Sequence, residues 1–388
     1  MEIITLTNIF TLLSRSCLLV LFLALVGCQT KQQTPEVAPP IISGPIEASK
    51  IEMPVAPVDK NQPKVKVAVL LPLSGENHIL GNELLNSAQM SMFENKGDNI
   101  EMIVLDTKGD PSTASSMAQS AISQGAKMIV GPVYSTEATA VKPIAQNSGV
   151  PVISLSNNQE VAAAPVFTFG FGPKDQIWKL MQVAKLNGLK NIGAFVPKSP
   201  HGQMIKSELE RAAQSMGMPT PFVLEFDNTT TDFTKFAKDF KASKVDGIVI
   251  PEGGQKLRLI VSGLLYGDLK GVKFMGTGQW DTPDINFDST LIGGWFVASP
   301  MEPRVNFNKR YEAIYSKTPQ RIATLAYDAI SLAIKAADSR SGMINYGLLT
   351  DQRGFSGVDG VFKLLPNGQV ERDLSVYEIT ESGLKKVG

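Results

Sequence analysis

The sequence contains very little of the chemistry on which most enzymes and nucleic-acid-binding proteins depend. Its 388 residues include only 2 cysteines, Cys17 and Cys28, and 2 histidines. The acidic and basic residues balance to a formal net charge of +0, and no basic stripe is visible. Thiol catalysis, disulfides and cysteine-metal sites are thereby excluded beyond Cys28, and the charge argues against a nucleic-acid partner.

Motifs typical of catalysis are missing as well. The sequence has no G-x-S-x-G turn, no P-loop and no H-E-x-x-H. His78 and His201 have no metal-ligand spacing, and we interpret both as solvated loop residues, with a place in a cleft as the alternative for His201. Asp106 and Asp110 invite an acid-base interpretation, but a strand end and a helix N-cap are preferred. We expect no catalysis, no metal and no cofactor.

The longest apolar run lies at the N-terminus. Arg15 precedes CLLVLFLALVG, a run too short for a comfortable membrane span and typical of a secretory signal peptide. Residues 25–28 resemble a bacterial lipobox, which implies that residues 1–27 are a signal peptide and that Cys28 is acylated. The alternative is that the apolar run stays uncleaved as a membrane anchor. Gln29 follows the cysteine instead of Asp. In a Gram-negative cell this resemblance implies a lipid anchor on the periplasmic side of the outer membrane; elsewhere it implies the inner membrane or the cell surface.

A proline-rich stretch then separates the anchor from the folded part. Residues 28–63 carry seven prolines without apolar periodicity, which prevents a helix and stiffens the chain. At ~3.1 Å per residue such a tether reaches on the order of 100 Å. The remaining residues, about 325, exceed the usual size of a single core and predict two lobes.

Strands that alternate with single helices are predicted throughout residues 64–291. KVKVAVLLP, IEMIVLDT, AKMIVGP and VPVISLS have the apolar runs of buried strands, and amphipathic helix patterns separate them. This α/β alternation favours two lobes, each a parallel sheet flanked by helices. A β-hairpin is expected near the C-terminus, with Pro366, Asn367 and Gly368 at its turn. We place lobe 1 at about 64–169 plus 292–345 and lobe 2 at about 170–291 plus 346–388.

Ligands of parallel sheets bind beyond the carboxyl ends of the strands, and a cleft between two lobes is a favoured site. The loops at those ends hold short polar side chains that can bind an anion together with backbone N–H groups. Trp280 is equally well a structural plug or a ligand platform. The candidate cleft residues are Ser74, Ser135, Thr136, Ser154, Ser156, Asn157, Asn158, His201, Glu252, Gln279 and Trp280.

Several segments in a fixed order resemble one family. KVAVLLPLSG, DTKGDP, GAKMIVGPVYST, SGVPVIS, TLAYDAI and GVDGVFKLLPNGQVER resemble the leucine-binding type of the class I periplasmic binding fold. TGQWDTP, GGWFVASP and RYEAIYSKTPQRIATLAYDAI are most similar to penicillin-binding protein activator lipoproteins. The resemblance implies a non-enzymatic protein with a membrane tether that acts on peptidoglycan synthases.

A second function remains open, that of a solute receptor for an amino acid or another small molecule that works with an ABC permease. A free amino acid needs a carboxylate partner for its ammonium in a desolvated cleft. Where the leucine-binding resemblance implies an acidic residue, this chain has Gly278 and Gln279, and His201-Gly202 stand where a tyrosine-glycine pair is usual. Glu252, Asp281 or Trp280 are the possible substitutes. These departures favour the activator-like function over transport.

Overall fold

The computed structural model describes residues 63–282, 285 and 288–388. The expected signal peptide, Cys28 and the proline-rich tether lie outside the described residues. None of the helices in the described ranges has the length and hydropathy of a membrane span. The account below therefore concerns the part that follows the tether.

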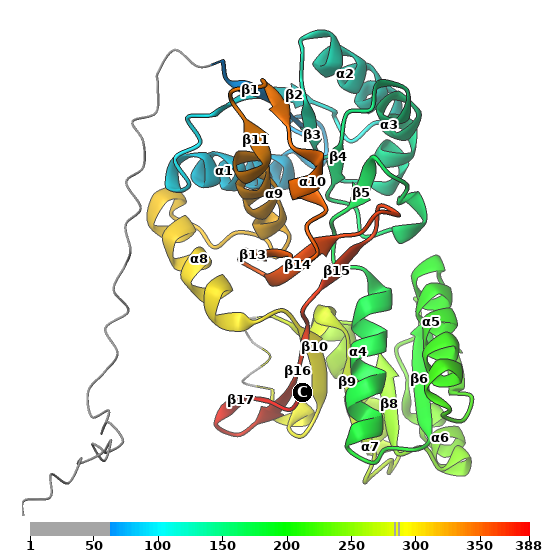
Figure 1. The fold of residues 1–388 in the computed structure, drawn as a ribbon. Helices are drawn as coiled ribbons and strands as arrows, with labels where there is room; N and C mark the ends of the chain where they lie inside the picture. The colour runs from blue at the N-terminus through cyan, green and yellow to red at the C-terminus, as the bar shows by residue number, and fades with distance from the viewer. Residues whose placement is uncertain (1–62, 283–284, 286–287) are drawn as a thin grey trace, which may run out of the picture. The chain divides into compact units, whose positions relative to one another are not determined.

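The first lobe is built on a five-stranded parallel sheet in the order β2-β1-β3-β4-β5 (Figure 1). Its central strands are wholly buried because helices cover both faces, as expected for a parallel sheet. The strands are β1 (Val65–Leu71), β2 (Ile100–Asp106), β3 (Met128–Val130), β4 (Val152–Ser154) and β5 (Val166–Thr168). The helices between them are α1 (His78–Glu94), α2 (Pro111–Ser123) and α3 (Ser135–Ser148).

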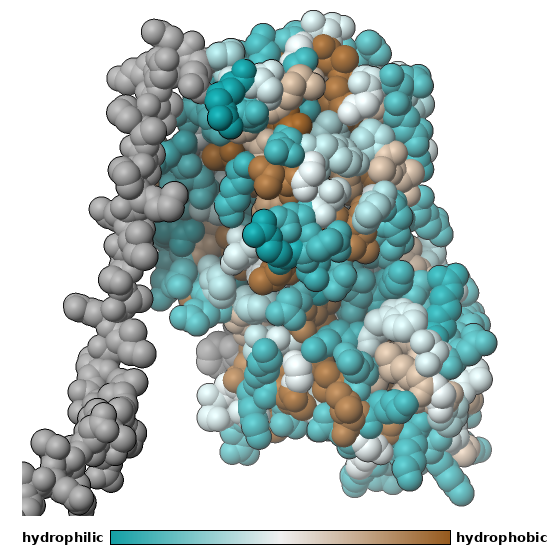
Figure 2. Space-filling model, viewed as in Figure 1, coloured by the Kyte–Doolittle hydropathy of each residue, from teal (hydrophilic) through white to brown (hydrophobic). Residues whose placement is uncertain are grey.

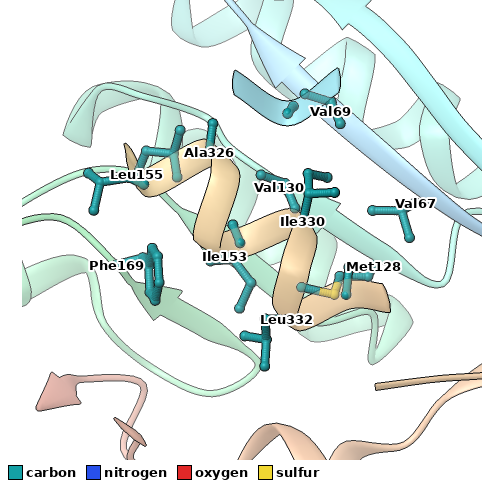
Figure 3. Close-up of a cluster of buried hydrophobic side chains, with 14 of the residues drawn as sticks. Val67, Val69, Met128, Val130, Ile153, Leu155, Phe169, Ala326, Ile330 and Leu332 are labelled. Atoms are coloured by element: carbon teal, nitrogen blue, oxygen red, sulfur yellow. The ribbon is translucent and has the colours of Figure 1, made fainter. Parts of the chain in front are cut away.

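Helix α9 (Ala323–Ala336) closes one face of this sheet although it lies far along the chain. Figure 3 shows Ala326, Ile330 and Leu332 of α9 lying against Val67 and Ile153 of the strands. Of the 14 residues of α9, 10 are buried, so its apolar face contributes strongly to the core. Helix α8 (Met301–Tyr315) joins the same lobe through Phe307 and Tyr311, which pack against Met90 of α1.

The second lobe contains a seven-stranded sheet in the order β17-β16-β10-β9-β8-β6-β7. Its strands are β6 (Ile192–Pro197), β7 (Phe222–Phe226), β8 (Gly247–Ile250), β9 (Lys273–Gly276), β10 (Trp295–Ala298), β16 (Ser375–Thr380) and β17 (Gly383–Lys386). Strands β16 and β17 pair antiparallel, and the others pair parallel. The helices are α4 (Pro173–Leu186), α5 (Pro200–Met216), α6 (Ala237–Ser243) and α7 (Gly254–Tyr266).

The assignment of the later segments to lobes was wrong at two places. Strand β10 pairs with β9 and β16 in the second sheet, whereas the sequence analysis placed residues 292–345 in lobe 1. Conversely, Phe362, Leu364 and Val370 pack in the core of the first lobe, although 346–388 was assigned to lobe 2. The residue pattern of a short apolar strand does not indicate which sheet the strand joins, so the sequence could not assign these segments to a lobe.

The C-terminal region also contains small elements that pack on the first lobe. Strands β13 (Phe355–Gly357), β14 (Gly360–Leu364) and β15 (Val370–Arg372) form an antiparallel sheet, which confirms the expected hairpin at Pro366 to Gly368. Short pieces precede it: β11 (Ala337–Asp338), β12 (Met343–Ile344) and α10 (Tyr346–Leu349). Figure 2 shows that polar residues cover much of the visible face, with apolar residues in scattered groups.

Candidate functional site

A small cleft lies where residues of both lobes meet, beyond the carboxyl ends of strands of the second sheet. Its volume is about 190 Å³. This is below the roughly 300–1,000 Å³ of common small-molecule pockets. The lining residues are Asn157, Phe171, Pro173, Gln176, His201, Ile205, Thr277, Gly278, Gln279, Asp281, Val297, Ala298, Ser299 and Arg321.

Asp281 is the one carboxylate among the described residues that line this cleft. It follows the 3₁₀ helix Gly278–Trp280, which begins just after β9. Both of its oxygens accept hydrogen bonds from the guanidinium of Arg304 on α8, and the bond from Nη2 to Oδ1 is 2.6 Å long. Only 6% of the Asp281 side chain and 12% of the Arg304 side chain are exposed. This is a bidentate, buried ion pair that joins the second lobe to a helix of the first.

Arg321, at the start of the segment leading into α9, extends the charge network. Its Nε lies 3.6 Å from Asp281, and its Nη2 lies 2.7 Å from Oδ1 of the fully buried Asp359. The guanidinium also stacks 4.2 Å from the ring centre of Phe171. Each charge at this end of the cleft therefore has an opposite charge within the protein.

The other end of the cleft holds neutral polar groups. The Gln279 amide nitrogen and Nε2 of His201 lie 3.3 Å apart. Burial lowers the pKa of His201, so its ring is neutral near pH 7. The backbone N–H of Gly278 donates to the side-chain oxygen of Gln176 at 2.6 Å. Together with Asn157, these groups can hydrogen-bond an uncharged ligand but offer no counter-ion.

The cleft brings together three of the residues predicted from sequence: Asn157, His201 and Gln279. His201 belongs to the first turn of α5 and is half-buried, not a solvated loop residue. The remaining candidates from the first lobe lie outside the cleft lining, among them Ser135, Thr136 and Asn158.

Three of the candidate serines in the first lobe, Ser74, Ser154 and Ser156, form hydrogen bonds with nearby backbone or side-chain groups. The hydroxyl of Ser74 donates to Asp106 at 2.5 Å, and that of Ser154 donates to the carbonyl of Pro132. Ser156 accepts from the N–H of Asn158. Asp106 ends β2 and Asp110 caps α2 by accepting from the N–H of Thr113, which confirms the strand end and the helix N-cap expected for them.

Trp280 is a structural residue in this fold. Its side chain is 0% exposed, and its indole N–H donates to the carbonyl of Ile250 at 3.0 Å. A Cβ on Gly276 would lie 2.2 Å from the indole, so the glycine makes room for the ring. Glu252 lies outside the cleft lining and half-buried, and burial raises its pKa although Lys256 opposes this shift.

Sequence reasoning missed the residues that close the charged end of the cleft. Arg304 was not among the predicted residues, yet its guanidinium is nearly buried against Asp281. Phe171, Ser299 and Arg321 also line or border the cleft. They lie in segments that pass between the lobes, where no periodic pattern marks a site. Among the described residues no group of three or more His, Cys, Asp or Glu side chains is placed to hold a metal ion.

The model of one family, described as "Periplasmic binding protein", matches residues 64–384. The chain belongs to this family. Solved structures agree on the fold: a putative branched-chain amino acid ABC transporter protein from Rhodospirillum rubrum superposes with a TM-score of 0.74 at 16% identity, covering 84% of this chain and 100% of that one. The α/β fold of parallel sheets flanked by helices, expected from sequence, is thereby confirmed.

Two kinds of named relatives match the periplasmic binding protein domain. The penicillin-binding protein activator LpoA of Mannheimia succiniciproducens is 24% identical over 322 residues, which cover 80% of this chain and 53% of that protein. The Leu/Ile/Val-binding protein homolog 6 of Brucella melitensis is 24% identical over 238 residues, 58% of this chain and 60% of that protein. The chain spans about half the length of the first relatives that it matches.

Proposed function

We propose that this chain is a non-catalytic, periplasm-facing lipoprotein that regulates a peptidoglycan synthase in the manner of penicillin-binding protein activators. The proposal rests on one observation, that the carboxylate of Asp281 is already paired with a cation of the same chain. The carboxylate that could hold the ammonium of an amino acid already accepts two hydrogen bonds from Arg304. A free amino acid would have to displace a buried bidentate ion pair before it could bind, which is costly.

Two further observations support this function. The cleft volume of about 190 Å³ is small, and its uncharged end has no partner for a zwitterion among the described lining residues. The relatives of the chain include proteins named for activating penicillin-binding proteins, matched over most of this chain. The predicted acylation of Cys28 and the tether would hold the domain at a membrane within reach of a synthase.

The second candidate is a solute receptor of an ABC transporter. It is favoured by the relatives named for binding Leu, Ile and Val and by the fold shared with transporter proteins. In that case the neutral groups Asn157, His201 and Gln279 would select an uncharged small molecule.

Direct binding to a purified bifunctional penicillin-binding protein from the same organism tests the first function. We expect saturable binding and a faster rate of glycan polymerisation or crosslinking by that enzyme. A panel of uncharged small molecules together with amino acids and short peptides in a thermal-shift assay tests the second. A ligand at a hundred times its dissociation constant adds ~2.7 kcal/mol of stability, so a true ligand is easily seen. A strong shift with one amino acid, without synthase binding, would refute the regulatory function.

A further inference from the structure

The ion pair between Arg304 and Asp281 joins two parts of the chain that different cores hold in place. Asp281 follows β9, whose Phe274 and Met275 lie in the cores of the second lobe. Arg304 lies in the first turns of α8, which is anchored on the first lobe through Phe307 and Tyr311. The pair is therefore a bond between lobes, in addition to the chain segments that connect them.

The position of the pair is that of a ligand contact. Asp281 lines the cleft, and its carboxylate receives a planar guanidinium edge-on through two hydrogen bonds. A ligand between two lobes stabilises their contact because it bonds to both. Arg304 does the same from within the chain, since its cation meets an acid of the second lobe while its helix, whose Met301 packs on the second lobe, continues onto the first lobe through Phe307 and Tyr311.

We infer that Arg304 is an internal ligand of the cleft: its guanidinium occupies the acidic site at Asp281 that a small cation would otherwise fill, and so holds the lobes together without a solute. The inference goes beyond the proposed function and concerns only the cleft. It holds whether or not the chain acts on a peptidoglycan synthase.

The neighbouring charges agree with this role. Arg321 approaches the same carboxylate but has its closer ion pair with Asp359, at 2.7 Å against 3.6 Å. Asp359 also accepts the hydroxyl of Thr324 at 2.5 Å, so Arg321 is held within the first lobe. Without Arg304, Asp281 would have only the more distant cation of Arg321, at 3.6 Å, and the space of the missing guanidinium would be empty.

The test is chemical rescue in the full-length chain, purified in detergent. In Arg304→Ala, hydrogen exchange of the backbone amides in 155–160 and 276–282 should become at least several-fold faster than in the wild type. Methylguanidine at millimolar concentration should slow that exchange and raise the melting temperature, whereas the uncharged methylurea should do neither. The wild type should respond to neither compound.

Arg310→Ala is the matched control. Arg310 lies on the same helix and forms a bidentate pair with Glu94, at 2.9 and 3.2 Å, but Glu94 belongs to α1 of the same lobe. This variant should leave exchange in the cleft segments unchanged. Equal exchange in Arg304→Ala and Arg310→Ala, or an equal response of the wild type to methylguanidine, would overturn the inference.

Arg304→Met serves if Arg304→Ala does not fold, because the apolar side chain keeps the volume of the arginine stem. Its cleft segments should exchange faster than those of the wild type. Methylguanidine should have less effect than in Arg304→Ala, because the methionine side chain takes up part of the space that the compound needs. If the cleft segments of this variant exchange their amide hydrogens at the wild-type rate, the guanidinium does not join the lobes, and the inference is overturned.

Discussion

Substitution of Asp281 by alanine should cause one of the largest losses of stability available at a single position of the cleft. The Asp281 side chain is 6% exposed, and its removal leaves the guanidinium of Arg304, itself 12% exposed, without its two acceptors. Loss of one partner from a buried ion pair typically costs 3–5 kcal/mol, because the other charge stays desolvated. We therefore expect the free energy of unfolding of Asp281→Ala to fall by about 3–5 kcal/mol.

Urea unfolding followed by tryptophan fluorescence measures this change. Asp281→Asn, which keeps the shape and removes the charge, should lose most of the same free energy. Lys198→Ala is the control, because the pair of Lys198 with Asp227 is exposed, at 52% and 63%, and exposed pairs contribute about 0–1 kcal/mol. The deficit of Asp281→Ala should persist in roughly 1 M NaCl, since a buried pair is poorly screened. A loss no larger than that of Lys198→Ala would refute the reasoning.

Three further predictions concern neighbouring features. Trp280→Ala should lower the free energy of unfolding by about 3–5 kcal/mol in urea unfolding, because the ring is fully buried; a change below about 1 kcal/mol would contradict this. Gly202→Ala should displace the start of α5, and with it His201, because a Cβ would lie 1.9 Å from the carbonyl oxygen of Pro197; an unshifted His201 in a crystal structure would contradict this. Burial raises the pKa of Asp175 from 3.8 to about 6, so the folded state holds a proton that the unfolded chain releases. As pH rises from about 4 to about 6, the wild type should accordingly lose more stability than Asp175→Asn does, and parallel pH profiles of the two proteins would contradict the assignment.

Much of the architecture could be predicted from local sequence. The helix cap at Asp110 and the turn at Asn367-Gly368 depend on side chains next to them in the chain, and both occur as expected. Helix α4 begins at Pro173, with Gly172 as its N-cap and Asp175 in its first turn. A proline suits the first turn of a helix, which explains this start.

The candidate site was only partly predictable. Asn157, His201 and Gln279 were found because each lies close to the carboxyl end of a strand, where a parallel sheet gathers its loops. Ser74 and Ser154 fit the same rule, yet their hydroxyls are used by Asp106 and by the carbonyl of Pro132. The rule identifies an edge of the sheet, and hydrogen bonding within each loop then decides which side chains remain available.

The sequence by itself determined the alternation of strands and helices, the two sheets that follow from it, and the absence of cysteine after Cys28. These properties depend on residues close together in the chain or on composition alone. The tertiary structure decided which sheet receives β10, that Trp280 is a buried plug, and that Arg304 meets Asp281. Each of these depends on residues brought together from different lobes or distant segments, and no local pattern records such a meeting.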